Sequence, residues 1–251
     1  MIKIERGCCP SELTDDEVRR LTNEFKLDNN KRVWDKPYLK EALFSLFHGK
    51  CCYCETLLKE ESKYLTVDHF HPKDAYPDEV VKWENLLPCC SRCNSNKGTH
   101  DTYKYPIINP SCDNVKEFLY INAYAYESRD NNELGRMTKD VLGLNASEEL
   151  VRPRFYVGEA IREKLSEIYE NVIRYKENIS DVRAKNKIVR GITDILRFAS
   201  PEKQYSALAA TIIVENDDYM HIKEKMLSCG LWSDEIKTLE DYAKNVSLSK
   251  C

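Results

Sequence analysis

The residues best suited to chemistry are two pairs of cysteines, each with a two-residue gap. Cys51 and Cys54 form the first pair, and Cys90 and Cys93 form the second. A two-residue gap lets one tight turn present both sulfurs to one ion, and four thiolates suit tetrahedral Zn²⁺. We therefore predict a structural zinc site. Because four thiolates leave no open coordination position, this zinc cannot activate water.

Neighbouring cysteines make the choice of zinc ligands ambiguous. Cys52 and Cys89 lie directly beside the predicted ligands, but they would give gaps of one and three residues. The two-residue pairing is the usual one, so we expect both to face the core. The other cysteines show no ligand spacing and are interpreted as buried or idle thiols: Cys8, Cys9, Cys112, Cys229 and Cys251.

Polar residues between the two cysteine pairs, and one directly after the second pair, follow an order that points to a nuclease. Asp68 and His69 end a predicted strand, Asn85 follows in a loop, and Asn94 begins a helix directly after Cys93. In this combination the segment resembles the HNH endonucleases of the ββα-metal class, in the variant whose last position is Asn. The resemblance implies hydrolysis of phosphodiester bonds in nucleic acid.

That reaction assigns a role to each of these polar side chains. His69 can serve as the general base, because an imidazole titrates near neutral pH. Asp68 and Asn94 offer hard oxygen ligands that suit Mg²⁺ or Mn²⁺, which would neutralise the charge that develops on the phosphate. By the resemblance, Asn85 orients the His69 segment and does not touch the metal.

Further side chains are candidates for contacts to the substrate. Lys97, at the end of the motif, is either a phosphate contact or an ordinary surface lysine. His71 would share a strand face with His69, and it is a second metal ligand, a substrate contact or a solvated loop histidine. Lys73 follows in the same segment and is assigned to substrate binding. His100 is a weaker candidate of the same kind as His71.

The resemblance extends to one HNH family, the nuclease subunit of the Septu anti-phage system, which is also associated with some retrons. The segments that carry it are Met1–Arg6 ahead of Pro10 and Leu13, Val67–Lys73, and Leu142–Asn145. The family usually has Glu at position 68 and Arg at position 71. Asp68 keeps a carboxylate, whereas His71 removes an expected basic side chain.

The resemblance implies partners as well as a substrate. A Septu nuclease works with an ATPase of the ABC/SMC-like type, and DNA is the favoured substrate because HNH sites usually cut DNA. One alternative is an RNA nuclease that cuts a structured RNA such as tRNA, working with a retron reverse transcriptase and its msDNA. Another is a zinc-stapled nucleic-acid-binding subunit without catalysis. The presence of Asp68, His69 and Asn94 argues against the latter.

The charge of the chain bears on how it would meet nucleic acid. The net charge is −4 and the pI is near 5.9, whereas a free-standing nucleic-acid binder is usually basic. Either a local basic patch or a partner must therefore bring the substrate. The mean hydropathy is −0.59, and no apolar run reaches the roughly 18 residues of a membrane span. We see no signal peptide and expect the protein in the cytoplasm.

The flanking segments predict an α+β, mostly helical fold around the ββα-metal core. Thr14 to Glu17 is a capping box that predicts a first helix. Asp35 is expected to cap a second helix, which Gly49 closes. A strand is predicted over 64–68, and a loop over 71–78. From Phe155 onward, apolar stripes that include Ile173 and Ile188 predict helices.

These patterns divide the chain into four predicted segments. Residues 1–50 form an N-terminal helical segment, and residues 51–110 form the HNH nuclease core with its zinc knuckles. Residues 111–154 connect this core to a C-terminal helical domain over residues 155–251. The stripes of the C-terminal helices are those of ordinary core packing.

Overall fold

The computed structural model describes residues 1–58, 65–177 and 181–250, which fall into two compact units. Unit 1 consists of Met1–Phe118 and Glu127–Asn145, and unit 2 consists of Leu119–Tyr126 and Ala146–Cys251. Helices dominate, with two small two-stranded sheets, so the predicted α+β, mostly helical fold is confirmed. Within the described ranges, no helix is both long and apolar enough to cross a membrane.

Unit 1 begins with helices α1 (Asp15–Leu27) and α2 (Pro37–Leu46). The Thr14 hydroxyl caps α1 as predicted, accepting a bond from the Glu17 N–H at 3.2 Å. The predicted cap of α2 is wrong. Lys36 is the residue directly before this helix. The Asp35 carboxylate pairs instead with Arg32 and Lys40, and these ion pairs compete with a hydrogen bond to the backbone of the helix.

The end of α2 follows the prediction. Gly49 has a φ of 71°, which favours glycine, and its N–H donates to the Phe44 carbonyl at 2.7 Å. The chain then enters the first cysteine pair.

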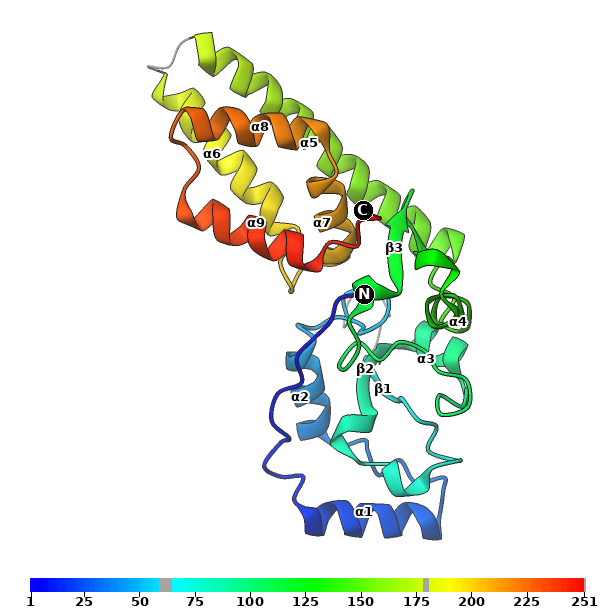
Figure 1. The fold of residues 1–251 in the computed structure, drawn as a ribbon. Helices are drawn as coiled ribbons and strands as arrows, with labels where there is room; N and C mark the ends of the chain where they lie inside the picture. The colour runs from blue at the N-terminus through cyan, green and yellow to red at the C-terminus, as the bar shows by residue number, and fades with distance from the viewer. Residues whose placement is uncertain (59–64, 178–180, 251) are drawn as a thin grey trace. The chain divides into compact units, whose positions relative to one another are not determined.

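The ββα motif follows, at the centre of unit 1 in Figure 1. Strands β1 (Leu65–His69) and β2 (Leu86–Cys90) pair antiparallel, with His69 opposite Leu86, and α3 (Ser91–Lys97) leaves directly from β2. Of the strand predicted over 64–68, residue 64 lies outside the described residues. One apolar core joins the motif to α1 and α2, formed by Leu13, Leu21, Phe25, Val33, Trp34, Leu39, Leu43, Val67, Val80, Val81, Trp83 and Leu86.

Two elements in the connecting segment were not predicted. The first is a β-hairpin of β3 (Leu119–Asn122) and β4 (Ala125–Ser128). Its turn residues Ala123 and Tyr124 have φ values of 43° and 69°, a conformation that turn rules reserve for glycine and asparagine. The second is helix α4 (Glu133–Val141), which Asn132 caps.

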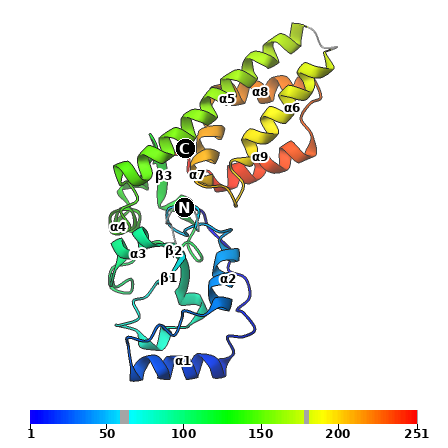
Figure 2. The same ribbon diagram turned by 180° about the vertical axis from the view of Figure 1, so that it is seen from behind.

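Unit 2 is a helical bundle around one long helix, as Figures 1 and 2 show. The long helix α5 (Arg152–Glu177) contacts α6 (Val182–Arg197), α7 (Ser206–Val214) and α8 (Asp217–Ser228), and α9 (Asp234–Val246) contacts α6 and α7. Ile188 is buried as its stripe predicts. Ile173, assigned to the stripe of α5, is 47% exposed, so that assignment is wrong.

Candidate active site

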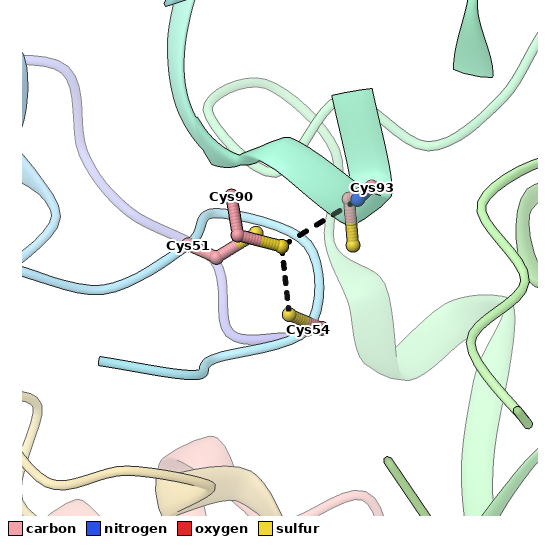
Figure 3. A group of neighbouring side chains, drawn as sticks. All are labelled: Cys51, Cys54, Cys90 and Cys93. Atoms are coloured by element: carbon pink, nitrogen blue, oxygen red, sulfur yellow. Dashed lines mark hydrogen bonds between the residues drawn. The ribbon is translucent and has the colours of Figure 1, made fainter. Parts of the chain in front are cut away.

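The four predicted zinc ligands converge in unit 1, as Figure 3 shows. The sulfurs of Cys51, Cys54, Cys90 and Cys93 all lie within 4.8 Å of one another, and all four residues are buried. Zinc–sulfur bonds of about 2.3 Å in a tetrahedron would separate the sulfurs by about 3.8 Å. The sulfurs of Cys54 and Cys90 are 3.7 Å apart. The group therefore fits a closed Cys₄ zinc site.

The two neighbouring cysteines are excluded from this group. Cys52 and Cys89 are buried, but neither belongs to the set of converging sulfurs. Burial raises the pKa of each of these two thiols well above the usual range of a cysteine. They face the core, as the two-residue spacing predicts.

His69, the last residue of β1, is buried and held by a backbone carbonyl. Its Nε2 lies 2.8 Å from the Val80 oxygen. A carbonyl can only accept, so Nε2 carries the proton and the lone pair remains on Nδ1. Trp34 packs edge-on against the imidazole, with ring centroids 4.7 Å apart. Burial lowers the pKa of His69 to about 4, so the imidazole is neutral at pH 7.

Asp68 is 3% exposed, and both of its carboxylate oxygens are engaged. The Tyr53 hydroxyl donates to Oδ2 at 2.6 Å, and the Lys97 ammonium donates to Oδ1 at 3.0 Å. Tyr53 lies between Cys51 and Cys54, so the zinc-binding turn reaches the carboxylate directly. Burial, together with the Asp68 charge, raises the pKa of Tyr53 well above its usual range, which keeps this hydroxyl a donor.

Lys97 differs from both sequence interpretations. It is neither a surface lysine nor a free phosphate contact, because the residue is 3% exposed. Besides its ion pair with Asp68, its ammonium donates to the His69 carbonyl at 2.6 Å. One turn of α3 thus places a buried cation against the two consecutive residues that end β1.

Asn85 ties down the loop that follows β1. Its side-chain oxygen accepts from the His71 N–H at 2.7 Å. Its amide donates to the carbonyls of His71 at 3.0 Å and Glu79 at 3.1 Å. Since Val80 directly follows Glu79, the same side chain fixes both the segment after His69 and the carbonyl that holds the His69 ring.

A cleft of about 300 Å³ brings several predicted residues together. Asp68, His69, Asn94 and Lys73 all line it, whereas Asn85, His71 and Lys97 do not. Sequence reasoning missed other lining residues, including Arg32 and Trp34 from the segment before α2 and Asp74 beside Lys73. The Lys73 ammonium pairs with Asp74 at 2.9 Å and lies 5.4 Å from the centre of the Trp34 ring.

The two other histidines near the motif do not line the cleft. His71 stacks on Tyr103 at 3.6 Å between ring centres, and its Nδ1 lies 2.7 Å from the Thr102 hydroxyl. That hydroxyl already donates to the Phe70 carbonyl at 2.8 Å, so His71 Nδ1–H is the donor. The Nε2 of His100 lies 2.6 Å from the Tyr105 carbonyl.

Comparison with known proteins agrees with this geometry. Residues 51–100 match the HNH endonuclease family model. The ββα motif, the cysteine cluster and this match define an HNH nuclease domain.

Over nearly its whole length, the chain also resembles proteins named Septu protein PtuB. It is 42% identical to that of Bacillus thuringiensis over 248 residues, which cover 98% of this chain and 95% of the relative. It is 25% identical to that of Bacillus mycoides (strain KBAB4), with 91% and 94% covered. The chain belongs to the Septu PtuB family.

Proposed function

We propose that this protein is a metal-dependent HNH endonuclease that hydrolyses phosphodiester bonds of DNA as the effector of an anti-phage complex. One observation carries the proposal. A neutral imidazole, His69, has one nitrogen bound to the Val80 carbonyl and the other bearing a lone pair. This imidazole lines the same cleft as Asp68 and Asn94.

In this proposal His69 activates the attacking water. Its Nδ1 takes a proton from the water as the oxygen bonds to phosphorus and the bond to the leaving oxygen breaks. The Val80 carbonyl holds the ring and stabilises the imidazolium that forms, since Nε2–H then points at a negative dipole end. Asn85 acts as a positioning residue, because its hydrogen bonds fix the loop on both sides of this contact.

Asp68 and Asn94 are the residues that would hold Mg²⁺ or Mn²⁺. Their donor set fits such an ion: each Asp68 oxygen accepts one hydrogen bond and keeps a further lone pair, and both residues line the cleft. When bound, the metal supplies Lewis-acid stabilisation of the charge on the phosphate. Lys97 and Tyr53 hold the Asp68 carboxylate in place, which is the role that we assign to Lys97 instead of phosphate contact.

We assign substrate binding in the cleft to two basic side chains that line it, Lys73 and Arg32. Lys73 lines the cleft with a 26% exposed side chain, and Arg32 lines it with a 66% exposed one. The Lys73 ammonium lies 5.4 Å from the centre of the Trp34 ring, and both side chains suit contacts to phosphate oxygens. His71 is instead a loop-packing residue, because Thr102 and Tyr103 occupy one edge and one face of its ring.

A metal titration tests the proposed function. Purified protein is incubated with labelled duplex DNA and increasing Mg²⁺ or Mn²⁺. We expect cleavage that needs the metal, and a higher metal concentration for half-maximal cleavage in Asn94→Ala, with zinc content unchanged. The matched control is Ser95→Ala, an exposed neighbour on α3 that should leave the titration unchanged. Cleavage by Asn94→Ala at wild-type metal concentrations would overturn the ligand assignment.

The ATPase partner is the second part of the proposal. The acidic balance of the chain, with a net charge of −4, supports a partner that brings the DNA. We expect an ATPase encoded beside this gene to co-purify with the protein and to stimulate cleavage. A monodisperse monomer that cuts DNA at full rate alone would contradict this part while leaving the nuclease assignment intact.

A further inference from the structure

Unit 2 contains a polar groove that the proposed nuclease reaction does not use. It lies between the facing sides of α5 and α6 and has a volume of about 430 Å³. Its lining includes Lys164, Glu167 and Ile168 of α5 and Arg183, Lys187 and Arg190 of α6. Gly191 lets the helices approach closely, because a Cβ there would meet Ile168 at 2.9 Å.

The groove is basic although the protein is acidic. Four of its lining residues are Lys or Arg and two are acidic. Both acids are already engaged. Glu167 pairs with Lys187 at 3.0 Å and lies 3.9 Å from Lys164, and Asp194 pairs with Arg197 at 3.6 Å. The hydrogen bond from Lys187 lowers the pKa of Glu167, so this acid is ionised and partly balances the two lysines.

Arg183 and Arg190 supply the excess positive charge. Both are exposed, and within residues 1–58, 65–177 and 181–250 neither has an ion-pair partner. Together with Lys187 they follow a spacing of four and three residues along α6, which places them on one helix face. The stretch Val182–Arg190 contains four basic residues and no acidic one.

The spacing of this row matches a nucleic-acid backbone. Seven residues of helix separate Arg183 from Arg190, a distance of about 10 Å along the axis. Phosphates of one DNA strand follow one another about every 3.4 Å along the duplex axis, so the row faces about three of them. Asn171 and Asn186 add side chains that can bond to phosphate and sugar oxygens.

We propose that the groove between α5 and α6 binds the sugar-phosphate backbone of duplex DNA through Arg183, Lys187 and Arg190. The inference deepens the proposed function, because it rests on DNA being the substrate and gives unit 2 a part in holding it. An acidic polypeptide is the less suitable ligand. Among the described residues that line the groove, Ile168 alone is large and apolar, whereas protein partners anchor in apolar pockets.

A pair of double variants with equal charge changes tests this site. Arg183→Gln/Arg190→Gln removes the two arginines of the groove that have no ion-pair partner among the described residues and leaves Lys187 in place. Lys225→Gln/Lys237→Gln removes two cations of α8 and α9 that lie outside the basic stretch and do not line the groove. Each pair is introduced into the full-length His69→Ala protein, and binding to a 30-base-pair duplex is measured by fluorescence anisotropy at several salt concentrations without divalent cations.

We expect the groove variant to bind about tenfold more weakly than the control, with a salt slope reduced by about 1.8, since each phosphate contact contributes about 0.9. Equal affinities and slopes for the two variants would overturn the proposal. So would weaker binding of poly-glutamate with unchanged DNA affinity, which would assign the groove to an acidic polypeptide. The readout is binding alone, so a failure of the metal-dependent cleavage assay is a separate result.

Discussion

Replacing Lys97 with Met tests whether the buried ion pair holds the end of β1. The Asp68 and Lys97 side chains are 3% and 0% exposed, and their charged atoms are 3.0 Å apart. Removing the ammonium leaves a buried carboxylate whose remaining hydrogen bond comes from Tyr53. Breaking a buried pair in this way costs about 3–5 kcal/mol of unfolding free energy.

A double-mutant cycle separates this charge effect from lost packing. Asp68→Asn should cost a similar amount, because it leaves the Lys97 ammonium buried without its counter-ion. Lys97→Met/Asp68→Asn contains neither charge. We therefore expect the double variant to be at least about 2 kcal/mol more stable than the sum of the single losses predicts.

Urea unfolding with zinc in the buffer measures these free energies. Trp34 and Trp83 both lie in unit 1, so tryptophan fluorescence in a Trp232→Phe background reports on the unit that contains the pair. A loss of less than about 1 kcal/mol for Lys97→Met would refute the reasoning, since surface ion pairs contribute no more than that.

Four further outcomes follow from the site. Burial lowers the pKa of His69 to about 4, so the base is lost only as the pH falls through that value. kcat/KM should thus stay flat from pH 8 to roughly pH 5.5, and an acid limb near pH 6.5 would contradict this. Cys93→Ser should lose zinc and unfold unit 1 in circular dichroism, and full zinc retention would contradict the Cys₄ site. Asn85→Ala should cost about 3 kcal/mol in urea unfolding, because it leaves backbone groups of the His69 loop unpaired, and a loss below about 1 kcal/mol would count against that contact. Tyr53→Phe should raise the metal concentration for half-maximal cleavage without changing zinc content, and an unchanged titration would remove Tyr53 from the positioning of Asp68.

Residue type and spacing located the zinc group, and the resemblance to HNH endonucleases pointed to Asp68, His69 and Asn94, which line the cleft. Two-residue gaps determine which sulfurs one turn can present, so Cys51, Cys54, Cys90 and Cys93 converge as predicted. Asp68 directly precedes His69, and Asn94 directly follows the zinc ligand Cys93. The motif therefore fixes the position of both residues in the sequence.

Burial and backbone partners could not be predicted in the same way. The motif gives the sequence position of Lys97 but not the side of α3 that faces Asp68, so its burial was missed. The Val80 carbonyl has no side-chain signature at all. The contact of Tyr53 could have been predicted, because an aromatic residue between two zinc ligands has to pack against the residues around the zinc site.

Three strands were not predicted, for local reasons. Pro88 removes a backbone donor and argues against a strand. In β2, however, it lies opposite Val67, and in the part of the chain that the structure describes β2 pairs with no strand other than β1. The β3–β4 hairpin turns at Ala123 and Tyr124, without the Asn-Gly signal that usually marks such turns. In both places tertiary packing outweighs the local preference of the residue.

The most direct test of the central claim compares two histidine variants in one cleavage assay. His69 and His100 both have Nε2 beside a backbone carbonyl, but His69 alone lines the cleft with Asp68 and Asn94. With Mg²⁺ or Mn²⁺, His69→Ala should lose DNA cleavage while it keeps zinc and fold, and His100→Ala should cut at the wild-type rate. Normal cutting by His69→Ala would contradict the account.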